Sequence, residues 1–586
     1  MPVALSMAPG SALEHVPAAP EPIRPASQSF ASDGISLDSA LKCARVTSDT
    51  GHLNRFLLRP YLQEKDQCEL SHTTFRQVGT SPGRRDGTRH TTLQVFAITD
   101  ETLFEGAEPR VDQQTANNAR REVVSMFNDK QSERLLSLYF RFVYPAYPIL
   151  SRSWFYSSGN SVAERIRSLP LSLLSSLYAT SLPFILHDDY LNASLAGSAT
   201  SRNKLYRISW MAINEELHSP RLATLQACLL LLQRGPRNQY LGRTPFQSCL
   251  NALAVSLART LGLAHDCSPW TSLPLWERRV RIRLWWTVYT MDQWISLDSG
   301  ITCCIHSSEY DVPMLNAHRP HSPPDALQTP DHCAHFFHLV HLSRILADIH
   351  ETYFTVRAAA TTCQDLFLSL ELARPLRSRL TEWKQAFISD CAWEQKPSAE
   401  PNSDASLHLA FIVATMTLFR ALLRPIEIHE SQLSGSLGYH GRGAYGAVYT
   451  GCLNCAREAV DFLDKIVSIS GPWNGFWHSW SQNNFAIAST FLIQMSLCSQ
   501  ALVGGSASEI AANGRSQNGE SSVEHSANEI EKASSSMLGV MANDIVDLIN
   551  RWRRAIRVGG GSGGWRSSLM SLALVRIDGF MGASNA

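Results

Sequence analysis

The 586-residue sequence has no excess of charge of either sign, and this limits what its surface can bind. It contains 52 Lys and Arg and 52 Asp and Glu, so the formal net charge is zero. A protein that binds nucleic acid over its whole surface needs a basic excess, because neutralisation of phosphates supplies most of that affinity. The composition therefore excludes a whole-surface nucleic-acid binder, although a small local basic module is compatible with it.

Cysteine is also scarce, and several familiar motifs are missing. The 13 cysteines are scattered and odd in number, and the N-terminus shows no basic segment followed by an apolar one. Disulfide scaffolds and secretory signals have the opposite features, so we expect an intracellular, reducing environment. The sequence has no Walker loop, no dinucleotide-binding glycine motif and no G-x-S-x-G elbow. These absences disfavour the common nucleotide-binding and hydrolase classes.

What the sequence has is the material for a large buried core. Apolar residues make up 44%, with 14 Trp and 23 Phe. Residues 485–505 carry no charge over 21 positions, which is long enough to cross a bilayer. Six of these positions are Ser, Thr or Gln, and no aromatic belt or basic flank follows them. We interpret this segment as a buried core helix and expect no membrane association.

Apolar residues at helical spacing dominate from about residue 115 and predict an all-α fold. One helix is expected to begin at Ser219–Pro220, a second to begin at Thr244–Pro245 and end at Gly262, and a third to run from Trp276 to Gly300. The expected organisation is a disordered N-terminal segment at 1–49, a mixed, partly ordered lead-in at 50–114 with a short extended segment at 90–98, an all-helical body at 115–503, a disordered low-complexity insertion at 504–536, a helix at 537–558, and a Gly-rich hinge and tail at 559–586.

A histidine cluster is the most enzyme-like feature. His332, His335, His338 and His341 recur every three residues. On a helix this spacing brings neighbouring side chains to one face, but four such positions spread over about half the circumference, so at most two or three could share a metal. We favour a structural role. His335, His338 and His341 remain weak metal candidates, and a metal-dependent enzyme is one alternative function.

Two shorter patterns are weaker still. Cys452 and Cys455 form a lone C-x2-C, which is half of a zinc site, and we interpret both as buried thiols. A basic run near the C-terminus could serve nuclear import or solvate the end of a helix. It consists of Arg551, Arg553, Arg554 and Arg557.

Residues 250–313 carry a more specific pattern. LARTLGLAHDCSPW is followed by WERRVRIRLWWTVYTMDQWISLDSG and then by SSEYDVPML. This order resembles the middle homology region of fungal zinc-cluster transcription factors. The resemblance implies an all-α regulatory body with no catalytic residues, in which the matching positions act structurally. These positions are Leu261, Gly262, His265, Asp266, Arg279, Leu284, Trp285, Trp286, Asp292, Gly300, Asp311 and Pro313.

The similarity extends over about residues 115–500. Residues 140–155 and 476–492 are similar to the opening and later parts of the family's region, and residues 169–192 are similar to its nitrogen-catabolism co-activator branch. One departure is Ile301–Thr302, where the family usually has Arg-Pro.

The family's DNA-reading module is missing from this chain. It uses six cysteines to hold two zinc ions, whereas only Cys43 and Cys68 precede residue 115. We therefore expect no direct DNA contact from this chain and no cofactor in it, with zinc only if an upstream zinc cluster exists. A truncated gene model of a DNA-binding activator is the main alternative.

The resemblance implies a nuclear transcription regulator rather than an enzyme. Its expected role is as a co-activator of RNA polymerase II genes, in nitrogen or secondary metabolism. The expected partners are DNA-bound transcription factors and a small-molecule inducer that binds between helices. A homodimer or a heterodimer is left open at this point.

Overall fold

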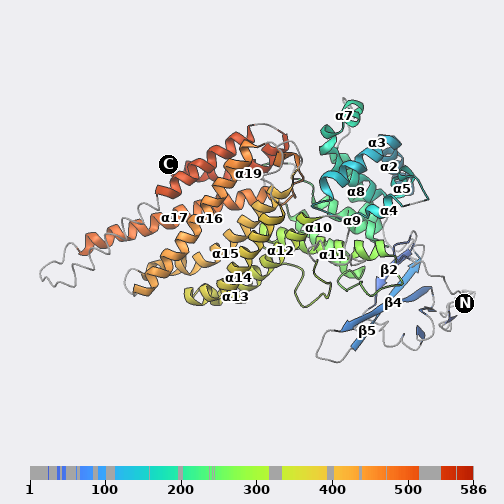
Figure 1. The fold of residues 1–586 in the computed structure, drawn as a ribbon, viewed down its shortest axis with the longest axis horizontal. Coiled ribbons are helices and arrows are strands. Elements are labelled where there is room, and N and C mark those ends of the chain that lie inside the picture. The colour runs from blue at the N-terminus through green and yellow to red at the C-terminus, as the bar shows by residue number, and fades with distance from the viewer. Residues whose placement is uncertain are drawn as a thin grey trace, which may run out of the picture. The chain divides into compact units, whose positions relative to one another are not determined.

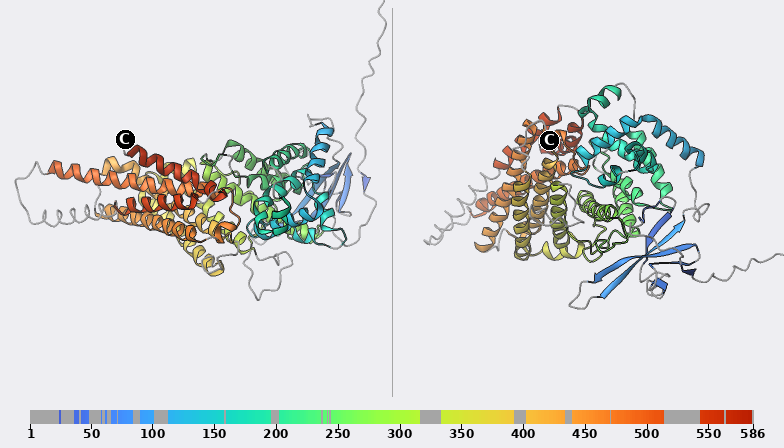
Figure 2. Two further views of the ribbon diagram at one scale, coloured as in Figure 1. Left: turned by 90° about the horizontal axis from the view of Figure 1, so that it is seen from above. Right: turned by 45° about the vertical axis from the view of Figure 1, so that its right-hand side comes forward.

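The structure, a computed structural model, divides into two compact units that are described separately (Figures 1 and 2). The sheet unit comprises Met1–Glu108 and Pro269–Leu273, and the helical unit comprises Pro109–Ser268 and Pro274–Ala586. Within them the structure describes residues 24–25, 36–39, 42–47, 58, 61–62, 66–70, 72–83, 90–100, 112–157, 159–195, 202–235, 238–240, 242, 244–315, 333–391, 402–433, 439–469, 471–513, 543–561 and 564–584.

The sheet unit contains one five-stranded sheet in the order β1-β3-β4-β5-β2, with every neighbouring pair antiparallel. Its strands are β1 (Arg24–Pro25), β2 (Lys42–Val46), β3 (Gln67–Leu70), β4 (Thr73–Gly83) and β5 (His90–Asp100). β4 and β5 are 11 residues each and pair along their length, with a bulge between Gln77 and Gly79. The short extended segment predicted at 90–98 is therefore confirmed as β5, within a larger sheet that the sequence analysis did not predict.

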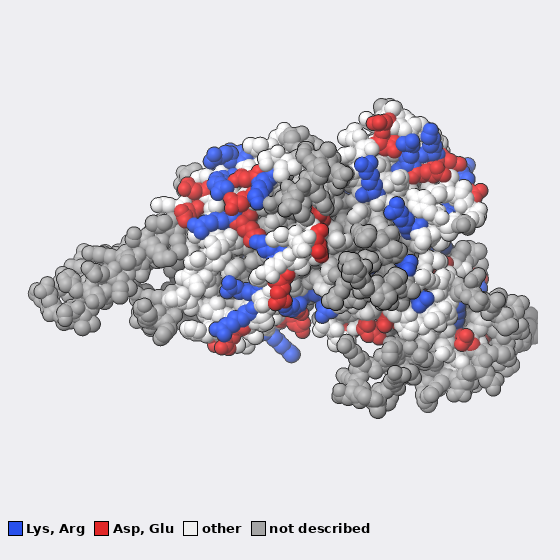
Figure 3. Space-filling model, viewed as in Figure 1, with Lys and Arg blue, Asp and Glu red and all other residues white. Residues whose placement is uncertain are grey.

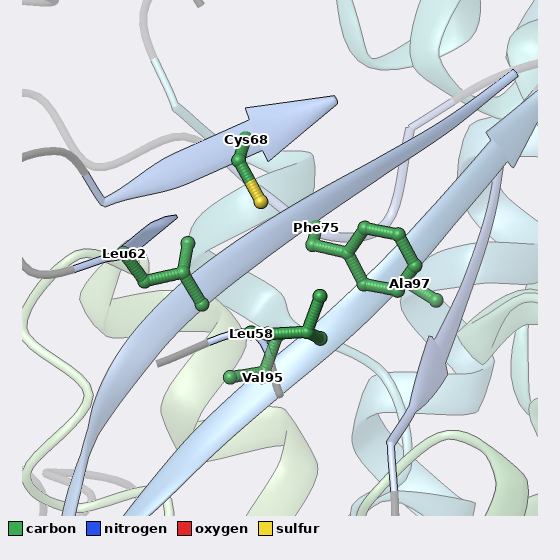
Figure 4. Close-up of a cluster of buried hydrophobic side chains, with 6 residues drawn as sticks. All are labelled: Leu58, Leu62, Cys68, Phe75, Val95 and Ala97. Atoms are coloured by element: carbon green, nitrogen blue, oxygen red, sulfur yellow. The ribbon is translucent and has the colours of Figure 1, made fainter. Parts of the chain in front are cut away.

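Alternation along β5 divides its side chains between the two faces of the sheet. On one face Val95 and Ala97 join a cluster of buried apolar side chains (Figure 4). The cluster consists of Leu58, Leu62, Cys68, Phe75, Val95 and Ala97. Phe96, between the two β5 members, is completely buried and contacts Trp270 edge-to-face, with ring centroids 5.5 Å apart. Because successive side chains of a strand point to opposite faces, the sheet has buried side chains on both faces.

Trp270 reaches the sheet from a segment far along the chain. It belongs to Pro269–Leu273, which lies between two helices of the helical unit in sequence. Ser272 Oγ donates to the Val78 carbonyl at 3.1 Å, and an Arg76 guanidinium nitrogen donates to the Ser272 carbonyl at 3.2 Å. A Cβ at Gly79 would come within 2.8 Å of the Trp270 ring, so glycine permits this close approach.

Helices form nearly all of the described part of the helical unit, which confirms the all-α prediction for this unit (Figure 1). Its first half contains α2 (Gln113–Met126), α3 (Asp129–Leu138), the π-helix η2 (Tyr139–Val143), α4 (Arg152–Phe155), α5 (Val162–Ser168), α6 (Leu171–Ser181), the 3-10 helix η3 (Leu182–His187), α7 (Asp189–Leu195), α8 (Arg202–Glu216), α9 (Leu222–Leu232), α10 (Pro245–Thr260) and α11 (Leu275–Ser299). Its second half contains α12 (Ala334–Tyr353), α13 (Val356–Thr362), α14 (Leu366–Asp390), α15 (Asp404–Leu433), α16 (Tyr439–Ser468), the 3-10 helix η4 (Gly471–Asn474), α17 (Ser481–Asn513), a helix over 543–560, and α19 (Gly564–Ser584).

Helix α11 lies at the centre of the helical unit. It packs against α9, α10, α12 and α17, and 18 of its 25 residues are buried. On one side α6 packs against α8 and α9, while on the other α14, α15, α16, α17 and α19 pack as a bundle (Figure 2). A helix buried on most sides must satisfy its polar side chains within the protein. The polar side chains of α11 therefore form hydrogen bonds with the segments packed around it.

Among the described residues, one helix is long and apolar enough to cross a membrane, and it is mostly buried. It is the part of α15 over Asp404–Ile426, where 83% of the apolar window is buried inside the structure. The bent pair Val162–Ser168 and Leu171–His187 passes the same test when taken together. Residues 485–505 lie on α17, whose Phe485 and Phe491 are completely buried. Burial of this kind is typical of core helices, as the sequence analysis proposed for this segment.

The predicted starts and ends of α10 and α11 are confirmed to within two residues. Thr244 and Gln247 form a capping box with Pro245 at the first position of α10, and Gly300 ends α11 with a φ of 65°. α9 begins later than predicted, at Leu222. Most of segment 1–49 and of insertion 504–536 lies outside the described residues, although 504–513 belongs to α17.

The prediction of a Gly-rich tail at 559–586 is wrong. Residues 564–584 form α19, with Met570 and Ile577 completely buried, and α19 packs against α17. The glycines indicated a hinge, but the apolar residues after them have helical spacing and a surface to cover. The predicted helix at 537–558 is described over 543–560.

Ion pairs link helix 543–560 to its neighbours and involve three of the four arginines of the C-terminal basic run. Arg551 donates to Asp461 at 3.0 Å and to Asp464 at 2.7 Å, and both Arg553 and Arg557 pair with Asp578 of α19. In Figure 3 acidic and basic side chains alternate in this region. The pairing favours a structural role for the run over a free import signal.

We expect Trp270→Ala to destabilise the sheet unit strongly. Removal of a completely buried tryptophan leaves a cavity against Phe96 and costs about 3–5 kcal/mol. Urea unfolding of the full chain measures the loss. Tyr61→Ala, at a side chain that is 49% exposed in the same unit, serves as the control and is expected to cost little. Equal effects of the two substitutions would contradict the packing described here.

Candidate functional site

The segment that carries the family resemblance begins where α10 ends. Gly262 adopts a left-handed φ of 72°, and its N–H donates to the Arg259 carbonyl at 3.0 Å. The N–H of Leu263 donates to the Ala258 carbonyl at 2.9 Å. This pair of bonds is a Schellman motif, which needs glycine at the left-handed position. The Leu-Gly-Leu pattern is thus a helix stop that turns the chain toward residues 264–266.

A buried ion pair lies within the beginning of α11, and its arginine also contacts the end of α10. An Arg281 guanidinium nitrogen lies 2.9 Å from a Glu277 carboxylate oxygen, and neither side chain is more than 3% exposed. A second Arg281 nitrogen donates to the Leu261 carbonyl at 2.9 Å. The cation therefore pairs with Glu277 and also satisfies a terminal carbonyl of α10. The dipole at the C-terminal end of a helix favours a positive charge in this position.

Asp292 connects α10, α11 and the segment after α11. It is completely buried. One carboxylate oxygen accepts from Asn251 Nδ2 at 2.9 Å and from the Cys304 N–H at 3.1 Å, and the other accepts from the Ile305 N–H at 2.9 Å. Burial raises the pKa of the Asp292 carboxyl, while these hydrogen bonds act in the opposite direction. The carboxylate thus fixes the chain that follows Gly300.

The two tryptophans of α11 form an aromatic cluster around Tyr310. The Trp285, Trp286 and Tyr289 rings have centroids 5.3, 5.8 and 5.7 Å from that of Tyr310. Trp286 also donates from Nε1 to the Pro313 carbonyl at 3.0 Å. Burial of such rings against one another contributes packing energy beyond the area they cover. The cluster therefore holds residues 310–313 against α11.

Asp311 joins the chain after α10 to the chain after α11. Its N–H donates to the Ala264 carbonyl at 3.1 Å, and its carboxylate accepts from the Asp266 N–H at 2.7 Å. His265 Nδ1 lies 4.0 Å from the same carboxylate. The His-Asp and Asp-x-Pro parts of the pattern therefore meet in space.

These contacts bring most of the motif positions into one structural unit, which we call the α11 junction. It consists of the end of α10 with residues 261–266, α11, and residues 301–313. Leu284 is completely buried within α11, whereas Arg279 is only half-buried and takes no part in the bonds described above. Most contacts of the junction end on backbone groups or on buried rings, and the others join pairs of side chains such as Asn251 and Asp292, so the arrangement is that of a scaffold.

The three described histidines of the cluster have different partners. His335 Nδ1 lies 3.3 Å from Asp404, His338 Nε2 lies 3.0 Å from Asp390, and His341 Nε2 lies 3.2 Å from the Leu315 carbonyl. The fourth histidine, His332, lies outside the described residues. In the described part of the chain no three His, Cys, Asp or Glu side chains are grouped so as to hold a metal. This geometry gives the metal-enzyme alternative no support.

A thiol–imidazole pair was missed because its members are far apart in sequence. Cys303 Sγ lies 3.6 Å from His350 Nδ1 and 3.2 Å from Gln293 Oε1. Burial raises the pKa of the Cys303 thiol to about 12 and lowers the pKa of His350 to about 4. Both groups are therefore neutral near pH 7, whereas a catalytic pair of this kind needs a thiolate.

A second missed cluster lies before α17. His478 is completely buried, stacks on Trp480 with centroids 4.8 Å apart, and lies 5.9 Å from the His335 ring. Neither of its ring nitrogens has a hydrogen-bond partner among the described residues. Burial lowers the pKa of His478 well below its ordinary value, and His335 acts in the same direction. This imidazole is neutral in the folded protein.

Comparison with known proteins points to the same family that the sequence resembles. Residues 136–385 match the model of the fungal specific transcription factor domain. Within this segment the chain is similar to that domain. The segment includes the whole α11 junction and runs from α3 into α14, so the resemblance derived from residues 250–313 is confirmed.

Curated proteins that are similar to this chain are named as transcription regulators. An uncharacterized transcriptional regulatory protein of Schizosaccharomyces pombe is 30% identical over 332 residues, which are 56% of this chain and 46% of that protein. The transcriptional activator protein DAL81 of Saccharomyces cerevisiae is 24% identical over 403 residues, 61% of this chain and 38% of its own length. Transcription factor macR of Penicillium terrestre is 27% identical over 212 residues, 31% of this chain and 23% of its own length.

The chain spans less than half the length of these curated relatives. No solved structure matches the chain at a comparable level of significance.

We expect Asp292→Asn to weaken the domain. In wild type both carboxylate oxygens accept from backbone N–H groups, whereas in the variant an amide nitrogen would face one of these donors. Loss of a buried hydrogen bond of this kind costs about 1–3 kcal/mol. Chemical unfolding of the full chain measures the change. Asp129→Asn, at a carboxylate that is 58% exposed, is the matched control and is expected to change little. An Asp292→Asn protein as stable as wild type would refute the role assigned to this carboxylate.

Acid should destabilise the helical unit through its buried histidines, and His350 allows a clean test. The unfolded chain binds a proton at this residue near pH 6.5, whereas the folded chain resists it until about pH 4, so lowering the pH favours the unfolded state. Between pH 7 and pH 5 we expect wild type to lose about 2 kcal/mol more stability than His350→Gln.

Urea unfolding at both pH values measures this difference between the two proteins. Burial raises the pKa of Glu216 and Asp292, which has the opposite effect on stability, but both carboxyls are present in each protein and cancel. Equal pH dependence of the two proteins would contradict the lowered pKa of His350.

Proposed function

We propose that this chain is a nuclear transcription regulator that acts as a co-activator of RNA polymerase II genes. The observation that carries the proposal is the similarity of residues 136–385 to the fungal specific transcription factor domain. The names of the curated relatives, a transcriptional regulatory protein and a transcriptional activator among them, support it. The similarity of residues 169–192 to nitrogen-catabolism co-activators supports target genes in nitrogen metabolism, with secondary metabolism as the alternative.

The proposed mechanism is contact with a transcription factor that is itself bound to DNA. The zero net charge and the ion-paired basic run of helix 543–560 favour protein partners over a phosphate backbone. The two cysteines that precede residue 115, Cys43 and Cys68, are both 1% exposed, and Cys68 packs in the core shown in Figure 4. Neither thiol is therefore placed as an open zinc ligand.

A small-molecule inducer belongs to the proposal as a further partner. A hollow of about 370 Å³ lies between α16 and helix 543–560, and its lining includes Val467, Arg554 and Val558. Its volume lies within the range of small-molecule sites. A ligand that binds only the folded protein must raise its apparent stability. A thermal-shift screen of nitrogen metabolites tests this part of the proposal. If no compound raises the melting temperature, the proposed inducer is contradicted.

Tethering of the full chain to a promoter tests the proposed activity. The chain is fused to a DNA-binding domain of unrelated origin and expressed with a reporter gene that carries the matching sites. We expect the fusion to raise reporter transcription several-fold, because tethering replaces the DNA-bound partner. The DNA-binding domain alone and a reporter without sites are the controls. Unchanged or reduced transcription would contradict a co-activator.

A further inference from the structure

The thiol–imidazole pair of Cys303 and His350 has two further polar side chains beside it. Gln293 and Ser296 lie three residues apart on α11, so their side chains share one face of that helix. Gln293 Oε1 lies 3.2 Å from Cys303 Sγ, and His350 Nδ1 of α12 lies 3.6 Å from the same sulfur. The Ser296 hydroxyl approaches this thiol as well. Four side chains from three segments of the helical unit therefore converge on one sulfur atom.

The Ser296 hydroxyl is buried beside the thiol and lacks any other partner. Ser296 and Gln293 are each 1% exposed. The Ser296 oxygen forms no hydrogen bond with any other described residue. Because a buried polar atom without a hydrogen bond costs free energy, such an atom indicates a ligand that the chain itself does not supply.

The spacing around the sulfur fits a tetrahedral metal ion. Zinc binds a cysteine sulfur at about 2.3 Å and a histidine nitrogen at about 2.0–2.1 Å, so these two atoms lie about 3.6 Å apart around it. The observed distance between Cys303 Sγ and His350 Nδ1 is 3.6 Å. Gln293 Oε1, at 3.2 Å from the sulfur, needs only a small movement to reach the same spacing.

Both strong ligands can take the form that zinc binds. Burial lowers the pKa of His350 to about 4, so its imidazole is neutral near pH 7 and has no charge to lose. When the ion binds, a lone pair of the Cys303 sulfur forms the bond to the metal and the thiol proton passes to water. Burial raises the pKa of this thiol to about 12, so the proton competes with the ion and binding is reversible.

The ligands are held in place before an ion binds, and the ion can reach them. Asp292 accepts from the Cys304 N–H, which fixes the residue next to Cys303. α11 and α12, which carry the other ligands, pack against each other (Figure 1). Cys303 and His350 are only partly buried, so they are open to solvent, whereas Gln293 and Ser296 form the inner side of the site.

We propose that these four side chains, which we call the Cys303 site, bind a zinc ion. Cys303 Sγ and His350 Nδ1 are the strong ligands, and Gln293 Oε1 and Ser296 Oγ complete the coordination. Thiolate and imidazole select zinc over magnesium and calcium, which prefer oxygen ligands alone. Only two of the four ligands are His, Cys, Asp or Glu, so the Cys303 site is distinct from the shared histidine site that the sequence spacing suggested.

The bound ion ties α12 to the α11 junction, because its ligands come from both sides of that contact. The domain that matches transcription factors thereby gains a response to the concentration of free zinc. The ion is a dissociable ligand of a half-open site rather than a permanent cofactor. This inference goes beyond the proposed function and does not depend on it.

Cobalt and zinc binding to the full chain, reduced and freed of metal with a chelator, tests the proposal. Co²⁺ is expected to give a thiolate-to-cobalt absorption band that saturates at one ion per chain and that Zn²⁺ then removes. Cys303→Ser and His350→Ala are each expected to weaken zinc binding at least about 100-fold, because loss of even a supporting partner of a ligand costs 10- to 100-fold. Zinc should raise the melting temperature of wild type and of neither variant.

Three controls separate the Cys303 site from other thiols and from misfolding. Cys249→Ser removes an exposed thiol on α10 and should bind zinc as wild type does. Mg²⁺ should leave the melting temperature of wild type unchanged, and circular dichroism should show the same helix content in every variant. Wild type without the cobalt band overturns the proposal, and so does a band that persists in Cys303→Ser or in His350→Ala. Any of these results leaves the proposed role in transcription unaffected, because the tethered reporter measures that role without added zinc.

Discussion

A buried carboxylate must be fully hydrogen-bonded, and the architecture of the helical unit follows from how Asp292 meets that requirement. Asp292 lies near the middle of the most buried helix and accepts from Asn251 on α10 and from two backbone N–H groups after α11. The chain that leaves α11 must therefore return to its flank, which brings Tyr310 and Pro313 onto the tryptophans of α11. The arrangement is a scaffold in which these residues hold α10, α11 and the segment after α11 together.

The parts of the fold that the sequence predicted are those with local signals. The signals are the Thr-Pro start and the Gly end of α10 and the Gly end of α11. Each depends only on residues next to that helix end in the sequence. The sheet was missed because β2 and β3 are only five and four residues long, and because Trp270 comes from nearly two hundred residues away. α19 was missed because its glycines were given more weight than the helical spacing that follows them.

The candidate site divides in the same way. The order of the motif residues could be derived from one sequence, but their contacts could not, because Asp292 is satisfied by backbone groups whose identity no sequence pattern records. The histidine spacing suggested a shared metal, whereas tertiary packing gave His335, His338 and His341 separate partners on α15, on α14 and after α11. His478 and Cys303 became visible only when distant segments were brought together.

The central claim is that Asp292 holds the segment after α11 in place, and hydrogen exchange of the full chain at the Cys304 and Ile305 amides tests it most directly. If both N–H groups are bound to the buried carboxylate, they exchange only when the helical unit opens, at rates as slow as those of amides within α11. Rapid exchange at both positions, while α11 stays protected, would contradict the account.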